Sequence, residues 1–284
     1  MSDGDIDIRP MTAADIPFGM ELKNAVGWNQ LPGDWQRLIN LEPDGCFVAT
    51  CDGESVGTAT STAYEDKFGW VAMVLVHPDH RRKGIGSALL YACIDYLEER
   101  VATVKLDATP MGKKLYDTLG FVDEYMMERW LGKGSGRGEV QGVEPITPEL
   151  LPAVCEFDSP VFGADRSRLI GMLVEEEPNT AVCVRSDDAV VGYGVLRPGY
   201  HTSQIGPLVA ADVRVAERLY SALLGAAGNE HVINDIVLPN HHVAEMLSRK
   251  GFEKQRYLIR MYKGQNKYPG HPEYVYAACG PEKG

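Results

Sequence analysis

Apolar and polar residues along this 284-residue chain follow two periods, and each period predicts one kind of element. Short alternating apolar runs predict strands, whereas apolar residues three or four positions apart predict amphipathic helices. In the first half of the chain, strands are expected at 6–10, 45–51, 55–63, 69–76, 102–108 and 121–130, and helices from Ala13 onward, at 33–41, at 86–99 and at 111–118. This order predicts an α/β fold (α+β, with a mixed sheet).

Local signals support several of these elements. Thr12 and Asp15 have the spacing of a capping box at the start of the first helix. Asp52 and Gly53 form a dipeptide that is typical of a tight turn between two strands. Ile85 begins a stripe of apolar residues at four-residue spacing, which predicts that the third helix buries one face.

The two halves of the chain resemble each other weakly. IRPMTAADIP at 8–17 resembles VEPITPELLP at 143–152, and FVATCDGESVG at 47–57 resembles VCVRSDDAVVG at 182–192, at a near-constant offset. Such an offset indicates a duplication. The predicted organisation is one domain at 1–131, a Gly-rich linker at 132–142, and a second, degenerate domain at 143–284.

Three cations and two glycines, RRKGIG at 81–86, stand between the predicted strand at 69–76 and a helix. Glycine lets consecutive backbone N–H groups turn toward one point, and a helix N-terminus adds its positive end. The pattern therefore predicts an anion pocket of a size that suits a pyrophosphate.

Three kinds of phosphate-binding loop bear on this stretch. The G-x-x-x-x-G-K-[ST] string of a nucleotide P-loop is absent. A dinucleotide loop would need glycine where Leu89 stands, although Asp107 lies at the end of the next strand, where such folds carry a ribose-binding acid. Arg81, Gly84 and Gly86 satisfy the third pattern, [R/Q]-x-x-G-x-[G/A], and here the chain resembles the coenzyme A loop of the GCN5-related N-acetyltransferase (GNAT) superfamily. A tight turn with incidental charge is the structural alternative.

A second block, LDATPMGKKLYDTLGF at 106–121, resembles the N-x-x-A-x-x-L-Y-x-x-x-G-F pattern of the same family. Thr109 stands where Asn is usual and Gly112 where Ala is usual. The resemblance implies that Tyr116 is a general acid that protonates the departing thiolate. The alternative is a helix tyrosine that packs with its hydroxyl in solvent.

The resemblance also implies an acetyl-CoA site in the first domain. The pantetheine arm would pair with the backbone of the preceding strand like an additional strand, and the loop would hold the pyrophosphate. The implied cofactor-binding residues are Val74, Leu75, Val76, Arg81, Arg82, Lys83, Gly84, Ile85, Gly86 and Ser87.

The second half of the chain keeps the same order of elements without this chemistry. Asp212 stands in the position of the loop, no glycine pair accompanies it, and Leu247 replaces the tyrosine. A carboxylate at that place would repel a pyrophosphate. The second domain is therefore predicted to have the fold without the cofactor site.

Composition limits the partners. A formal net charge of −12 disfavours nucleic acid, and no apolar run approaches the roughly 20 residues that cross a bilayer. The six cysteines form no C-x-x-C pair and no secretory signal pattern begins the chain, so free thiols in a cytoplasmic protein are expected. The histidines lack metal-ligand spacing, and no metal site is predicted.

The sequence gives weaker signals for the residues that bind the acceptor than for those that bind the cofactor. Trp28, Asn29 and Gln30 lie in a loop where they could line an acceptor pocket, because an aromatic face suits a cation, although core packing explains Trp28 equally well. The strand at 69–76 has no carboxylate that could deprotonate an amine. The remaining candidates for a base are Glu65, Asp66 and His77.

Together these features predict an acetyl-CoA-dependent N-acetyltransferase. Because no Ser or Cys has a nucleophile signature, the amine of a small molecule is expected to attack directly in a ternary complex, with a protein or peptide acceptor less favoured. A non-catalytic acyl-CoA-binding or regulatory module remains the alternative, and a nucleotide-dependent enzyme is a third, weaker one. The sequence does not indicate the oligomeric state.

Overall fold

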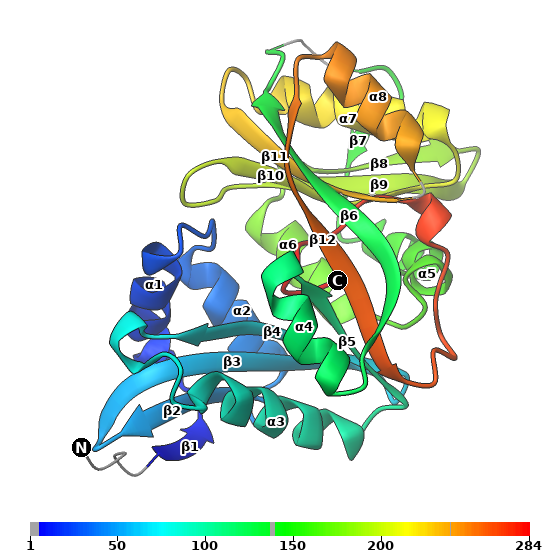
Figure 1. Cartoon of the computed structure of the whole chain (residues 1–284). Coiled ribbons are helices and arrows are strands. Elements are labelled where there is room, and N and C mark those ends of the chain that lie inside the picture. Colours follow the sequence, from blue (N-terminus) through cyan, green and yellow to red (C-terminus); the bar gives the residue numbers. More distant parts are fainter. Residues whose placement is uncertain (1–5, 137–139, 239) are drawn as a thin grey trace. The chain divides into compact units, whose positions relative to one another are not determined.

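The computed structural model describes residues 6–136, 140–238 and 240–284, which form two compact units. Unit 1 runs to Leu106 and also contains 263–267 and Lys283, and unit 2 contains the other described residues. Figure 1 shows the elements of both units. Residues 1–5 of the predicted first domain and 137–139 of the predicted linker lie outside the described residues.

Unit 1 is a mixed sheet with helices packed on it. The sheet order is β1-β2-β3-β4-β5, with antiparallel pairs up to β4 and a parallel β4–β5 pair. Its elements are β1 Ile6–Pro10, the 3₁₀ turn η1 Ala13–Asp15, α1 Ile16–Ala25, α2 Pro32–Leu41, β2 Cys46–Cys51, β3 Glu54–Tyr64, β4 Phe68–Val76, the 3₁₀ turn η2 Pro78–His80, α3 Ile85–Glu98, and the first residues of β5 Thr103–Ala108.

The elements predicted for the first half of the chain are confirmed to within a few residues. Thr12 and Asp15 form the predicted capping box, in which the Thr12 N–H donates to Asp15 Oδ2 at 2.8 Å. Asp52 and Gly53 turn β2 into β3 with φ values of 51° and 85°. The apolar stripe that begins at Ile85 is buried, as its four-residue spacing predicts.

The strands of unit 2 follow the order β12-β6-β11-β10-β9-β8-β7, with β13 paired to β10. Its elements are α4 Pro110–Thr118, β6 Val122–Lys133, β7 Glu144–Pro145, α5 Leu151–Phe162, α6 Ser167–Glu176, β8 Ala181–Ser186, β9 Ala189–Arg197, β10 Ser203–Ala210, α7 Val213–Ala226, β11 His231–Val237, α8 His241–Arg249, β12 Glu253–Gly264, the 3₁₀ turn η3 Pro272–Tyr274 and β13 Val275–Ala277.

Strand β6 does not take the place that the duplication suggests. The sequence predicts that it completes the sheet of the first domain, but it lies between β11 and β12, both of which come from the second half of the chain (Figure 1). It pairs antiparallel with β11 from Lys133 opposite His231 to Met127 opposite Val237. Two residues of the predicted linker, Gly132 and Lys133, therefore belong to β6.

Two buried ion pairs hold these strands. Arg129 on β6 donates through Nε and an η nitrogen to both oxygens of Asp235 on β11, at 2.7 and 2.6 Å. Arg260 on β12 does the same to Asp107 at the end of β5, at 2.9 and 3.0 Å. Both carboxylates are fully or almost fully buried. Since a buried charge without its partner is costly, these pairs specify where β6 and β12 lie.

Gly132 shows why part of the predicted linker is structured. A Cβ atom at this position would lie 2.3 Å from the Phe252 ring. The glycine therefore lets the ring pack directly on the backbone of β6, and Phe252 itself is buried. A glycine-rich sequence can thus mark close packing as well as flexibility.

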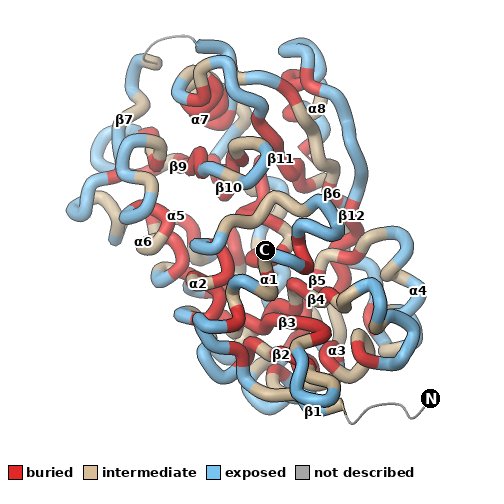
Figure 2. The backbone as a smooth tube through the Cα atoms, turned by 90° about the vertical axis from the view of Figure 1, so that its left-hand side faces the viewer, coloured by how far each residue is buried: buried red, intermediate tan, exposed pale blue. Residues whose placement is uncertain are grey.

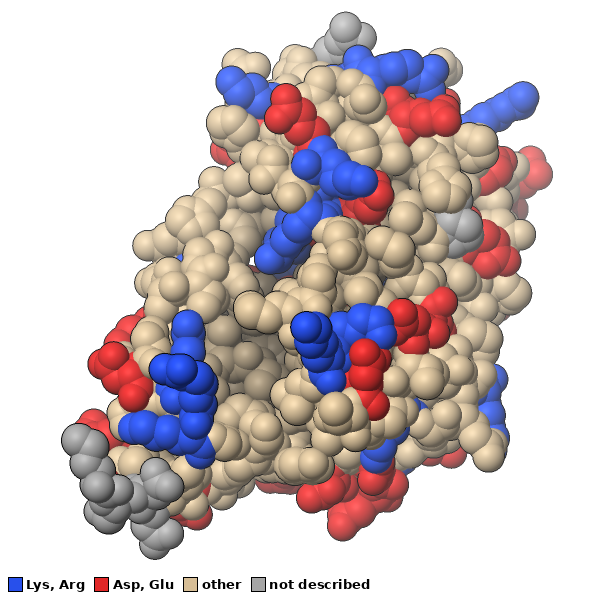
Figure 3. All heavy atoms as spheres, viewed as in Figure 1, with Lys and Arg blue, Asp and Glu red and all other residues tan. Residues whose placement is uncertain are grey.

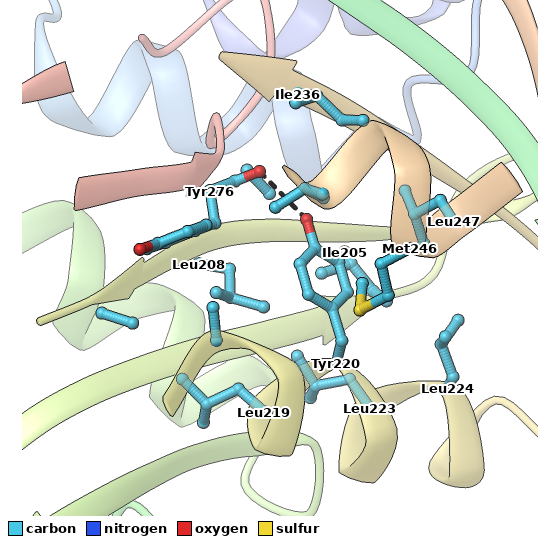
Figure 4. Packing of buried hydrophobic residues seen from close by; sticks show 14 of the residues in the cluster. Ile205, Leu208, Leu219, Tyr220, Leu223, Leu224, Ile236, Met246, Leu247 and Tyr276 are labelled. Carbon is cyan, nitrogen blue, oxygen red and sulfur yellow. Dashed lines mark hydrogen bonds between the residues drawn. The ribbon is translucent and has the colours of Figure 1, made fainter. Parts of the chain in front are cut away.

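The largest core of unit 2 lies between its sheet and helices α7 and α8. Leu219 and Leu223 of α7 meet Ile205 and Leu208 of β10 there (Figure 4). Tyr220, also in this core, donates its hydroxyl to the carbonyl oxygen of Tyr276 at 3.0 Å, which ties α7 to β13. Figure 2 shows the buried stretches along β3 of unit 1 and β9 of unit 2.

We expect Gly132→Ala to destabilise unit 2 by about 1–3 kcal/mol, because the new methyl group overpacks the contact with Phe252. Gly171→Ala is the matched control. Gly171 lies inside α6 with its nearest foreign atom at 3.8 Å, so alanine should keep or raise stability. Urea unfolding midpoints provide the measurement, and equal midpoints for the two variants would contradict the packing role of Gly132.

Candidate active site

The loop between β4 and α3 presents backbone amides without a side-chain cap. Arg82 and Gly84 adopt positive φ values of 63° and 81°. Gly84 is the N-cap residue of α3, and its carbonyl accepts the first helical bond from the Ala88 N–H at 3.0 Å. No side chain among the described residues caps this helix. The first amides of α3 are therefore oriented for an anion.

Three cations surround these amides. Arg81, Arg82 and Lys83 are exposed, and Figure 3 shows Lys and Arg side chains gathered over the loop before α3. The Arg81 Nε donates to the carbonyl oxygen of Val76 at 3.2 Å, so this side chain also fixes the loop to the end of β4. The predicted basic group is thus present, with Arg81 in an additional structural role.

The edge of β4 that precedes the loop is open in unit 1. The parallel pairing of β4 with β5 ends where Trp70 lies opposite Lys105. From Val71 to Val76, β4 pairs with β3 on its other side and with no other strand of the described residues. The predicted Val74, Leu75 and Val76 lie on this open edge, where an extended ligand could add as a strand.

Tyr116 lies on α4, in unit 2. The Thr109 hydroxyl caps this helix by accepting the Gly112 N–H at 3.1 Å, so the threonine replaces the usual asparagine in a capping role. A Cβ at Gly112 would meet the Tyr116 ring at 3.1 Å. The half-buried Tyr116 makes no hydrogen bond through its hydroxyl to any residue that the structure describes, and desolvation raises its pKa.

The residues predicted for the acceptor pocket are half-buried in the loop between α1 and α2. Trp28 packs against the core of unit 1, and its carbonyl oxygen accepts a hydrogen bond from Lys23 Nζ at 3.3 Å. Trp28 therefore has the packing role that the sequence left open. Asn29 and Gln30 follow it directly, and their role in acceptor binding stays a prediction.

The candidate bases differ in their surroundings. Glu65 lies in the turn before β4 with a φ of 56° and pairs with Lys67 at 2.8 Å. His77 accepts the Asp79 N–H through Nδ1 at 3.4 Å and so caps the short turn η2. Neither Glu65 nor His77 therefore has surroundings that identify it as the base that deprotonates the amine.

Sequence reasoning missed two features beside this edge. Met73 of β4 has a φ of 52°, which is rare for a residue with a side chain, and the buried Thr58 hydroxyl donates to its carbonyl oxygen. Thr58 belongs to a run of hydroxyl residues on β3, and hydroxyls on a buried strand are an available signal, because buried polar groups need partners.

The corresponding place in unit 2 is filled by the chain itself. Asp212 is the N-cap residue of α7, and its carboxylate accepts the N–H groups of Arg214 and Val215 at 2.8 and 3.0 Å. The parallel β10–β11 pairing covers three residues, after which β13 pairs with β10 at Leu208 and Val209. The Asp212 carboxylate thus caps the helix start that is uncapped in unit 1, and β13 pairs with the strand edge that is open in unit 1.

Asp107 cannot serve as the ribose-binding acid of a dinucleotide site. Its carboxylate is buried and held on both oxygens by Arg260. The observation removes the main support for the nucleotide-dependent alternative. Among residues 6–136, 140–238 and 240–284, no group of three or more His, Cys, Asp or Glu side chains is arranged for a metal ion. In the same residues, no helix is both long and apolar enough to span a bilayer.

Comparison with known proteins agrees with this geometry. Residues 19–121 match the model of the acetyltransferase (GNAT) family, and residues 154–277 match that of an acetyltransferase (GNAT) domain. A holothin acyltransferase of Pseudoalteromonas sp. (strain SANK 73390) is 27% identical over 259 residues, which cover 90% of this chain and 87% of that protein.

Solved structures with the same fold extend over both units. A putative acetyltransferase from Pyrococcus horikoshii has a TM-score of 0.85 and 25% identity, covering 100% of this chain and 97% of that one. A tandem GNAT protein from the clavulanic acid biosynthesis pathway has a TM-score of 0.64 at 13% identity, covering 92% and 98%. The chain belongs to the GCN5-related N-acetyltransferase family and is an N-acetyltransferase with two GNAT domains in tandem.

Proposed function

We propose that the first GNAT domain transfers an acetyl group from acetyl-CoA to the amine of a small molecule in a ternary complex. One observation carries the proposal: the uncapped, cation-flanked start of α3 follows a strand whose edge is open from Val71 to Val76. The family uses acetyl-CoA, and these two features match an anionic pyrophosphate and an extended amide-bearing arm.

The residues present suit the parts of acetyl-CoA. The N–H groups of Ile85, Gly86 and Ser87 would bind the pyrophosphate, and Arg82 and Lys83 would add positive charge beside it. The backbone of Val74–Val76 would hydrogen-bond the amides of the pantetheine arm. Acetyl-CoA then supplies an activated thioester, and the protein supplies its orientation.

Direct attack by the amine is supported by the cysteines. Burial raises the pKa of the Cys46 and Cys93 thiols to about 12, and that of Cys155 and Cys183 to about 11. Such thiols are protonated at neutral pH and are poor nucleophiles. An acyl-enzyme on any of these four is therefore disfavoured.

The reaction needs one proton donor and one proton acceptor. The amine attacks the carbonyl carbon, the C–S bond breaks with its electron pair on sulfur, and the proposed acid Tyr116 gives its hydroxyl proton to the thiolate. Its raised pKa keeps this hydroxyl protonated at neutral pH. Because β4 has no carboxylate, water is proposed to take the proton of the amine.

The acceptor proposal rests on charge and on the loop at Trp28. A net charge of −12 favours a cationic acceptor, and Asn29 and Gln30 offer hydrogen-bonding groups beside the aromatic ring. The relative from Pseudoalteromonas is named as an acyltransferase that acts on holothin. For this chain we propose acyl transfer, but not holothin as the acceptor. A non-catalytic module is not retained, because the family match is to enzymes. A cytoplasmic location stays a prediction.

The proposed function is tested with the full chain, acetyl-CoA and a panel of small amines, with release of the CoA thiol as the measurement. Turnover with at least one amine and none with a peptide panel is expected. Turnover with peptides alone would contradict the small-molecule proposal, and turnover with no amine of either panel would contradict acetyl transfer to amines.

We expect Gly86→Asp to weaken CoA binding about 30-fold or more (~2 kcal/mol), because a carboxylate would compete with the pyrophosphate for the amides of α3. The fold should persist, since Gly86 is the second residue of α3 and a negative charge in the first turn of a helix is favourable. Gly86→Ala is the control, because its methyl group would meet only Val76 Cγ2, at 3.5 Å.

Calorimetry of both variants measures affinity and stoichiometry. One site per chain is expected in the parent, and it should persist in Gly86→Ala. If Gly86→Asp retained full-affinity binding, the phosphate site would have to lie elsewhere, and a second saturable site in the parent would show that unit 2 also binds CoA.

We expect Tyr116→Phe to lower kcat roughly 100-fold while the affinity for acetyl-CoA changes little, because only the proton donor is removed. The parent should lose activity only at strongly alkaline pH, beyond the range of an ordinary tyrosine, since desolvation raises the pKa of Tyr116. The variant should lack this alkaline loss. A pH–rate profile from 6 to 11 provides the measurement, and identical profiles would assign the acid elsewhere.

A further inference from the structure

Strand β4 contains a bulge at the start of its open edge. Thr58 lies opposite Leu75, but Thr60 lies opposite Ala72, so two residues of β4 face one residue of β3. The first of them, Met73, has a φ of 52°. For a residue with a side chain this conformation is strained and persists only where the surroundings fix it.

Thr58 is the residue that fixes it. Its side chain is completely buried, and its Oγ1 donates to the carbonyl oxygen of Met73 at 3.0 Å. This carbonyl precedes the Val74 N–H in the same peptide unit, so holding the oxygen also sets the direction of that amide. The buried Thr58 hydroxyl on β3 thereby orients the Met73–Val74 peptide of β4. This peptide lies on the open edge of β4, where a ligand could bind.

Unit 2 offers an internal comparison. Its strand β10 has a similar irregularity, since Ile205 lies opposite Leu196 whereas Leu208 lies opposite Gly194. The last residue of β9 that pairs before the irregularity is Gly194, so Gly194 takes the place that Thr58 has in unit 1. Glycine has no side chain that could hold the bulge, and the hydroxyl of the neighbouring Tyr193 donates to Asp158 at 2.6 Å. The unit whose edge is covered by β13 has thus lost the hydroxyl at the bulge.

From this geometry we infer that Thr58 is a positioning residue for acetyl transfer: its hydroxyl holds the Met73–Val74 peptide so that the Val74 N–H faces the thioester carbonyl. The inference rests on the proposed function. Negative charge develops on that oxygen when the amine attacks, and a backbone donor that is already aligned stabilises it without reorganisation. The contribution of Thr58 should therefore appear in kcat.

Four variants of the full chain separate the hydroxyl from the packing. Thr58→Val keeps the volume and loses the hydroxyl, whereas Thr58→Ser keeps the hydroxyl and loses a methyl group. Thr58→Ala differs from Thr58→Ser by the hydroxyl alone, and it remains informative if valine prevents folding. Thr60→Val is the matched control: Thr60 Oγ1 is buried without a hydrogen-bond partner in the described part of the chain, and the apolar Leu196 takes its place beside the bulge of unit 2.

The assays are thiol release with an accepted amine, slow hydrolysis of acetyl-CoA without an amine, and calorimetry with CoA. We expect Thr58→Val and Thr58→Ala to lower kcat on the order of 10-fold or more, with the Kd for CoA within about threefold of the parent. Thr58→Ser should restore kcat to within about threefold, and Thr60→Val should match the parent. Amide hydrogen exchange over 71–76 should accelerate in Thr58→Val and Thr58→Ala alone.

The inference is overturned if kcat follows packing rather than the hydroxyl, so that Thr58→Ser is as slow as Thr58→Ala, or if Thr58→Val is as fast as Thr60→Val. Parallel changes in kcat and in the Kd for CoA would also overturn it, since they indicate a general loss of the site. Failure of the proposed function looks different: the parent itself would release no thiol, while hydrogen exchange would still report whether Thr58 fixes the bulge.

Discussion

Two buried Arg–Asp pairs join strands of unit 2 that come from different halves of the sequence. Arg129 and Asp235 join β6 to β11, and Arg260 and Asp107 join β12 to the end of β5. In each pair the arginine and the aspartate come from different halves of the sequence. Removing one partner of such a pair leaves an uncompensated buried charge, which typically costs about 3–5 kcal/mol. Neither half of the sequence therefore carries a complete sheet of its own.

The two GNAT domains differ at the positions where a cofactor would bind. In the first, Gly84 leaves the start of α3 uncapped and the edge of β4 is open. In the second, Asp212 caps α7 and β13 covers the edge of β10. In the second domain, Asp212 and β13 thus form the backbone hydrogen bonds that a bound anion and an extended ligand could form in the first domain. The same fold thus supports a reaction site in one copy and a self-contained structure in the other.

In unit 1, the strained backbone at Met73 is held by a hydrogen bond from a neighbouring strand. The left-handed conformation of Met73 lies at the bulge of β4, and the hydroxyl that holds it comes from a neighbouring strand. The loop that follows has two further positive φ values, at Arg82 and Gly84. Backbone conformations of this kind turn N–H groups away from regular pairing and toward a ligand. The Met73 side chain itself packs in the core of unit 1.

The sequence by itself determined the elements of the first half, the glycine loop and the duplication, because periodicity, turn residues and spacing are local signals. It also identified Asp212 as a negative charge at the second loop, whereas only the structure showed that its carboxylate caps α7. Only the tertiary structure decided the partners of β6, since a strand pattern shows which face is buried and not which edge it joins. The same holds for the three-residue β13, which is too short to have a period, and for the bulge at Met73, which a hydroxyl fifteen positions away in the chain holds in place.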